Sequence, residues 1–79
     1  MTEFSESGEK MDELKKMSNI ATDFQMDEKM RIQAINVLGD MASHESLLVL
    51  LNLAANDKLN IHERDLALKR AREIVKKGR

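Results

Sequence analysis

The sequence lacks cysteine, proline, tryptophan and tyrosine, and it holds two phenylalanines and three glycines among 79 residues. Without cysteine the chain has no disulfide, no thiolate metal site and no cysteine nucleophile. The absence of proline and the scarcity of glycine and aromatic residues argue against a turn-rich β fold and favour helix. We therefore expect an all-α protein, and the absence of disulfides is typical of a cytoplasmic one.

Long apolar runs are missing as well. The longest, residues 47–51, stops at Asn52 and is far shorter than the ~18 residues that a membrane span needs. The first twenty residues hold five acidic side chains and no apolar segment of the kind found in signal peptides. We expect no secretory signal and no membrane contact.

The composition is that of one small helical domain, with 34% charged and 42% apolar residues. Residues 1–8 are too polar and too few to pack alone, so we expect a flexible N-terminal arm followed by a single domain at residues 9–79. A core of this size supplies only about 3 to 5 kcal/mol, which makes additional stabilisation by a partner plausible.

Apolar residues recur at steps of three and four in four stretches, which predicts helices at about residues 9–22, 27–42, 44–56 and 61–77. The short connections predict that successive helices run antiparallel. Apolar residues cover more than half of the third helix, so we expect it to be the most buried. The residues expected to face the core are Met11, Leu14, Met17, Ile20, Ala21, Met30, Ala34, Ile35, Leu38, Met41, Ala42, Leu47, Leu48, Leu50, Leu51, Leu53, Ala54, Ile61, Ala67, Leu68, Ala71, Ile74 and Val75.

Helix-capping residues stand at the predicted boundaries. Asp27 and Ser43 are placed to cap the second and third helices. Asn60 stands three residues before Glu63, the spacing at which the two side chains can satisfy each other's backbone donors. Gly78 is placed for a C-terminal cap, and Gly39, inside the second helix, permits a close backbone approach.

The chain also contains an internal repeat. A shift of 33 residues produces five identical pairs, which fall in register with similar apolar pairs. The identical pairs are Leu14 with Leu47, Asn19 with Asn52, Ala21 with Ala54, Arg31 with Arg64, and Ala34 with Ala67. Because Arg31 and Arg64 are equivalent, we predict structural roles for both, each bound to a carboxylate or to a carbonyl at a helix end.

This pattern resembles the HEAT-like repeat, in particular the short type named after phycobilisome lyases. The positions that match its first helix are Arg31, Ala34, Leu38 and Gly39, those that match its second helix are Leu47, Leu50 and Leu51, and those that restart the pattern are Arg64 and Ala67. The resemblance implies stacked αα hairpins, a short α-solenoid of half a repeat, one repeat and half a repeat. Ala71 and Arg72 replace the second Leu-Gly pair of the pattern. An ordinary four-helix bundle remains the alternative.

We find no pattern for catalysis or metal binding. His44 and His62 each precede a Glu, but Leu48 and Leu66 occupy the place of the second His in a helical zinc motif. Both histidines fall at helix starts, where a solvated turn residue is the simpler interpretation. We therefore predict no catalytic residue, no metal and no cofactor, and a protein that is not an enzyme.

Charge is distributed unevenly along the chain. Residues 1–28 carry a net charge of −5, residues 29–61 are neutral overall, and residues 62–79 carry +4. The bases of the fourth helix form a candidate interaction surface, although a solvated face that complements the helix dipole is the simpler interpretation. Its members are Lys69, Arg72 and Lys76 on one stripe, and Arg70 and Lys77 on the next.

Two functions are compatible with these features. The first is a non-catalytic protein–protein interaction or scaffold module, because stacked hairpins present a rigid surface and their end helices lack a neighbour. Its partner is another protein or a second copy, and the oppositely charged ends favour a homodimer. The alternative is binding of a nucleic-acid backbone by the basic fourth helix, against which stand the net charge of −1 and the scarcity of stacking aromatics.

Overall fold

Four α-helices make up the protein. The computed structural model describes the backbone of residues 2–77 and the side chains of residues 12–77. The helices are α1 (Thr2–Ala21), α2 (Glu28–Met41), α3 (His44–Ala54) and α4 (Ile61–Lys77), and the described residues contain no strand. The expected all-α class is confirmed. The predicted start of the first helix at Glu9 is wrong, because α1 begins at Thr2.

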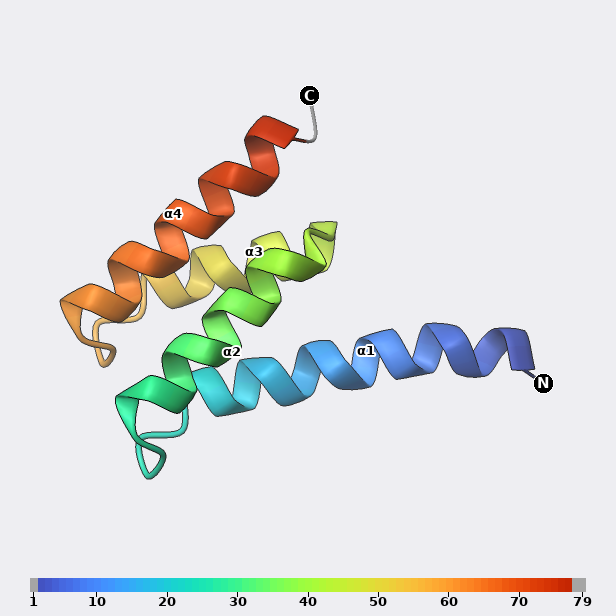
Figure 1. Ribbon diagram of the computed structural model, residues 1–79, viewed down its shortest axis with the longest axis horizontal. Coiled ribbons are helices and arrows are strands. Elements are labelled where there is room, and N and C mark those ends of the chain that lie inside the picture. The colour runs from blue at the N-terminus through green and yellow to red at the C-terminus, as the bar shows by residue number, and fades with distance from the viewer. Residues whose placement is uncertain (1, 78–79) are drawn as a thin grey trace.

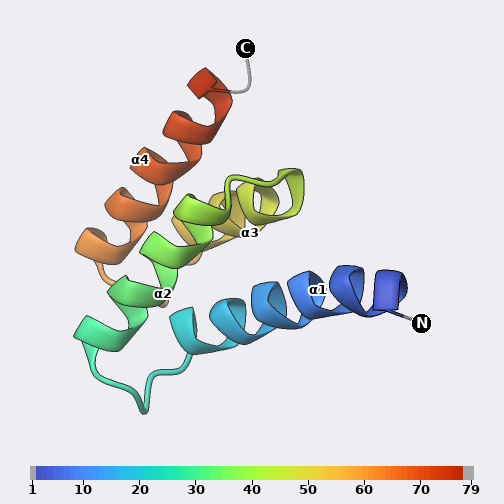
Figure 2. The same ribbon diagram turned by 45° about the vertical axis from the view of Figure 1, so that its right-hand side comes forward.

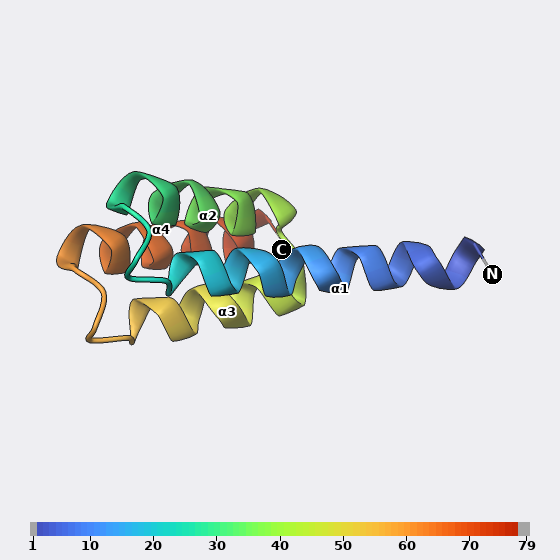
Figure 3. The same cartoon turned by 90° about the horizontal axis from the view of Figure 1, so that it is seen from below.

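The helices form two layers (Figure 3). In one layer α2 lies beside α4, and in the other α1 lies beside α3. The chain turns back at each connection, so that α2 and α4 point one way and α1 and α3 the other (Figure 1). The N-terminal half of α1 extends past the other helices (Figure 2). The Cα atoms occupy a slab of 42 × 34 × 16 Å, whose thickness is that of two helix layers.

The predicted caps at the start of the last three helices are present. Asp27 accepts a hydrogen bond from the backbone N–H three residues later, at 3.1 Å. The Ser43 hydroxyl does the same at 3.0 Å. Asn60 accepts from the Glu63 backbone at 2.9 Å, while the Glu63 carboxylate accepts from the Asn60 backbone at 3.2 Å. These side chains satisfy donors that the first helical turn leaves free. The predicted cap at Gly78 lies outside the described residues.

The two longer connections repeat each other at the shift of 33 residues. Asp23 Oδ1 accepts from the backbone N–H two residues later at 3.0 Å, and so does Asn56 Oδ1. The backbone carbonyls of the same two residues accept from the N–H three residues later, at 3.1 Å in both connections. The internal repeat seen in the sequence therefore extends to the hydrogen bonds of the loops.

The third connection is short and depends on one unusual backbone conformation. Ala42 ends α2 with φ 50° and ψ 34°, in the left-handed region, and Ser43 then caps α3. A left-handed residue reverses the chain quickly, at a cost of about 1 to 2 kcal/mol for a residue with a Cβ. The Ala42 side chain is exposed as a result, so its predicted inward position is wrong.

The core lies between the two layers. Its fully buried apolar residues are Ala21, Ala34, Ile35, Leu38, Leu50, Leu53, Leu59, Ala67 and Ala71. Ala34, Ala67 and Ala71 are at most 3% exposed. Ala34, Ala67, Leu38 and Leu50, which the sequence places on the core side of their helices, are therefore buried as predicted.

Several residues predicted to face the core are exposed instead. On α3, Leu48 is 49% exposed and Leu51 is 43% exposed, while Leu47 is half-buried. The third helix is therefore not the most buried, because no other described helix covers this side of it. The remaining corrections are Met30, Ile61, Leu68 and Val75, which are all exposed. The side chain of Met11 lies outside the described residues.

Replacing Leu50 by Ala tests this assignment of the core. The Leu50 side chain is fully buried, so the substitution should leave a cavity and lower the free energy of unfolding by about 2 to 5 kcal/mol. Leu48→Ala, on the exposed side of the same helix, should cost less than about 1 kcal/mol. Urea unfolding of both variants measures the difference, and equal stability would contradict the described packing of α3.

Candidate interaction surface

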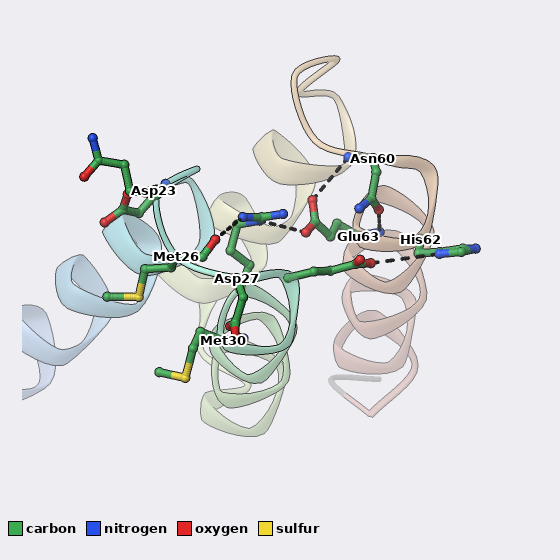
Figure 4. Close-up of polar contacts among 10 residues, drawn as sticks. Asp23, Met26, Asp27, Met30, Asn60, His62 and Glu63 are labelled. Carbon is green, nitrogen blue, oxygen red and sulfur yellow. Dashed lines mark hydrogen bonds and ion pairs between the residues drawn. The ribbon is translucent and has the colours of Figure 1, made fainter.

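A buried ion pair links α2 to α4 (Figure 4). Arg31 Nε donates to Glu63 Oε2 at 2.7 Å, and the Glu63 side chain is fully buried. Arg31 Nη1 donates to the Met26 carbonyl at 2.6 Å, and its guanidinium lies 5.4 Å from the centre of the Phe24 ring. The second oxygen of Glu63 already accepts from the Asn60 backbone. Both ions are satisfied by the fold, and the pair is structural.

Arg64, the repeat equivalent of Arg31, has a different partner. Its Nε donates to the carbonyl of Ala54, the last residue of α3, at 3.4 Å. The prediction that each arginine reaches a carboxylate or a helix-end carbonyl is confirmed. The carboxylate that Arg31 meets comes from the helix of the next repeat unit, and the described residues contain no such helix after α4.

The histidines lie at the surface as expected. His44 is exposed, and the exposed His62 lies with its Nδ1 3.9 Å from a carboxylate oxygen of Glu28. Among the side chains of residues 12–77, no group of three or more His, Asp or Glu residues is close enough to hold a metal ion.

The five bases of the predicted interaction surface lie on two sides of α4. One of them, Arg70, is bound to residues of α2 and is not a free cation. Arg70 Nη2 contacts Asp40 Oδ1 at 2.6 Å, and its Nη1 donates to Asn36 Oδ1 at 3.3 Å. Arg70 Nε lies 3.3 Å from Glu73 Oε1 without donating a hydrogen bond. Arg70 therefore joins α4 to α2, and this correction removes it from the candidate interaction residues.

Gly39 provides the space for this contact. A Cβ at position 39 would overlap the guanidinium of Arg70. The close backbone approach predicted at Gly39 is therefore not what this position accommodates, because the group packed against it is a side chain. Lys77 is exposed on the same side of α4, where it lines a small pocket beside Gly39 and Asp40.

The other three bases surround an apolar groove on α3 and α4, which we call the α3–α4 groove. Its apolar residues are Leu51, Leu68, Ala71 and Val75, and its polar residues are Lys69, Arg72, Glu73 and Lys76. The groove has a volume of about 480 Å³ and is open to solvent. Three cations and one carboxylate at its border give it a positive rim. An apolar floor with a charged rim makes the groove a candidate binding region.

The repeat explains why this groove is open. Leu68 is the equivalent of Ile35 at the shift of 33 residues. Ile35 is fully buried because α2 is packed by α1, α3 and α4, whereas Leu68 is 37% exposed. Within the described residues, no further helix covers α4 as α4 covers α2. The groove therefore lies on the face of α4 on which none of the described helices stacks.

Sequence reasoning placed Leu51, Leu68 and Val75 in the core and missed the groove. A signal for it was present in the repeat alignment. Leu48 and Leu51 align with Lys15 and Ser18, so the second unit is apolar where the first is polar. When one repeat unit has an apolar residue where the other has a polar one, that apolar residue is not part of the core that both units share. It indicates an apolar surface instead.

Comparison with other proteins adds no relative. No known family model, no curated protein and no solved structure matches this chain. None of the four helices, over the part of the chain that the structure describes, is long and apolar enough to cross a membrane.

The importance of the ion pair can be tested by removing one partner. Arg31→Met should lower the free energy of unfolding by about 3 kcal/mol, because it leaves the Glu63 carboxylate buried and unpaired. Arg31→Lys should cost less, since it keeps the charge and loses only the planar fork. The double variant Arg31→Met/Glu63→Gln should recover part of the loss, and urea unfolding measures all three. If it recovers nothing, Glu63 is not the group that Arg31 neutralises. Arg64→Lys, which loses a single long hydrogen bond, serves as the control.

A second test addresses Gly39. Gly39→Ala gains up to about 1 kcal/mol of helix propensity but displaces the Arg70 guanidinium from Asp40, so the variant should have nearly wild-type stability. In an Arg70→Ala background nothing is displaced, and the same substitution should raise the free energy of unfolding by about 0.5 to 1 kcal/mol. Thermal or urea unfolding of the wild type, Gly39→Ala, Arg70→Ala and the double variant measures how strongly the effect of one substitution depends on the other. Equal effects of Gly39→Ala in both backgrounds would contradict the described contact.

Proposed function

We propose that this protein is a non-catalytic protein–protein interaction or scaffold module that binds its partner in the α3–α4 groove. One observation carries the proposal. Leu51, Leu68 and Val75, which are 43%, 37% and 49% exposed, line a single groove on two adjacent helices. Scattered apolar side chains are normal on a protein surface, whereas a contiguous set bordered by polar residues is typical of a binding region.

The chemistry of the groove defines the kind of partner. Burial of apolar surface supplies about 25 cal/mol for each Å² removed from water, so an apolar helix face gains by docking on these side chains. Lys69, Arg72 and Lys76 stand around them and favour acidic residues at the border of the docked segment. An amphipathic helix with acidic flanks meets both requirements.

The repeat architecture supports the same function. Three features are consistent with a short HEAT-like solenoid of stacked hairpins. They are the two layers of helices, the loops that repeat at a shift of 33 residues, and the equivalent positions of Arg31 and Arg64. Such solenoids present rigid binding surfaces along their stacked helices. Action in the cytoplasm, which the cysteine-free sequence favours, is part of this proposal.

Binding of a nucleic-acid backbone is less well supported by the same contacts. Of the five bases on the candidate surface, Arg70 is engaged by α2, and Lys77 lies on the other side of α4 from the groove. The three that remain surround apolar side chains and share the groove with Glu73. A phosphate backbone needs a continuous cationic track, and a carboxylate interrupts it.

The test compares the full-length wild type with two variants. It measures how much of a specific protein each of them retains from a lysate of the cells that make this chain. The variant Leu51→Ser/Val75→Ser should retain a specific protein at least about tenfold less than the wild type does, since central apolar contacts dominate such interfaces. Ile61→Ser, which alters an exposed apolar residue outside the groove, should retain it fully. Equal retention by all three proteins would refute the proposal. Material that nuclease removes would indicate nucleic-acid binding instead.

A further inference from the structure

The first helix is longer than the repeat requires. The equivalent helix α3 begins at His44, which corresponds to Met11 at the shift of 33 residues, whereas α1 begins at Thr2. The backbone of residues 2–10 is therefore an extension without a counterpart in α3. Figures 1 and 3 show this part of α1 running beyond the other helices.

The composition of the N-terminal segment formed by this extension and residues 11–13 complements the α3–α4 groove. Residues 2–13 contain five acidic residues and a single base, Lys10. Phe4 is one of the two aromatic residues in the protein. The groove offers the converse, an apolar floor and a rim with three cations and one carboxylate. Phe4 and Met11 are the large apolar residues of this acidic segment. An acidic helix with a few large apolar residues is the kind of ligand that the groove chemistry selects.

The lengths of the two elements also correspond. At 1.5 Å per residue, the part of α4 from Leu68 to Lys76 that lines the groove is about 12 Å long, and residues 3–13 form a helix of about 15 Å. A helical segment of this length is long enough to span the groove.

The geometry excludes docking within one molecule. α1 contacts α2 and α3, and the described parts of α1 and α4 do not contact each other. They lie at opposite edges of the slab, with α2 between them in Figure 1. An α1 extension that reaches an α3–α4 groove must therefore come from another molecule.

Resting on the proposed function, we infer that the occupant of the groove is the acidic N-terminal segment of a second copy of this chain, residues 2–13. The segment contributes an aromatic residue and glutamates to this contact, and the groove contributes the apolar residues Leu51, Leu68 and Val75 beside Lys69, Arg72 and Lys76. Two molecules make the contact twice when they pair reciprocally, so the smallest closed assembly is a dimer. Because the dimer fills two grooves, its total buried surface is twice that of one contact. This brings the buried surface closer to the roughly 1,200 Å² that a stable dimer needs.

A charge exchange between the two surfaces tests this inference. The mass of the full chain is measured by light scattering coupled to size exclusion, at micromolar concentration and at a tenfold dilution. The wild type should form a dimer. The variants Glu3→Lys/Glu6→Lys and Lys69→Glu/Arg72→Glu should each dissociate at least about tenfold more readily, because each places like charges opposite one another. Combining all four substitutions restores opposite charges and should restore the dimer.

Two controls separate this contact from general effects of charge or folding. Lys29→Glu alters an exposed base on α2 outside the groove and should leave the dimer intact. Phe4→Ser removes the apolar anchor without changing the charge and should weaken the dimer at both low and high salt. Circular dichroism of every variant confirms that its helices are formed.

Three results would overturn the inference: a monomeric wild type at both concentrations, a dimer that neither charge reversal weakens, or a combined variant that stays dissociated. The proposed function fails by a different measurement. If the wild type is monomeric but Leu51→Ser/Val75→Ser still abolishes retention of a protein from the lysate, the groove binds a different acidic partner. If retention is unaffected as well, the groove is not a binding region.

Discussion

The contact between Arg31 and Glu63 is the constraint on which the arrangement of the helices depends. Glu63 is fully buried, and a carboxylate in that position is tolerated only when a cation and further hydrogen-bond donors satisfy it. Arg31 and the Asn60 backbone provide them, and the same guanidinium also holds the Met26 carbonyl of the preceding loop. One pair thus fixes the start of α4 against the start of α2.

Local features of this structure could be predicted because short-range chemistry determines them. Asp27, Ser43 and Asn60 cap their helices since an oxygen at that position meets a free N–H three residues later, whatever surrounds the helix. The direction in which Leu51 faces could not be predicted in the same way. Its burial depends on whether another helix lies over α3, and periodicity within one helix does not contain that information. The prediction for Arg70 failed for the same reason, because Asp40 belongs to a different helix.

The repeat connects the core to the candidate binding region. Equivalent positions in two units share a local structure but differ in what lies over them, as Ile35 and Leu68 do. Where a following helix covers the position, the apolar side chain stabilises the fold, and where none of the described helices does, the same kind of side chain lines a groove. Solenoids in general have this property, since each unit buries its apolar face only against its neighbours. In the proposed function, the partner binds to the apolar face of α4 that none of the described helices covers.

One residue at the groove bears on which partners the proposed function would exclude. At the internal contact, Gly39 leaves space for the Arg70 guanidinium of the following helix. The equivalent position in the next unit is Arg72, which lines the groove. A helix that stacked on α4 as α4 stacks on α2 would bring a cation to the place where Arg72 already provides one, without the space that glycine gives. Like charges and the larger side chain together disfavour a further identical unit, whereas Arg72 attracts a carboxylate. Arginine in place of glycine at this position therefore disfavours the stacking of a further identical unit, and it is consistent with the acidic partner that we propose.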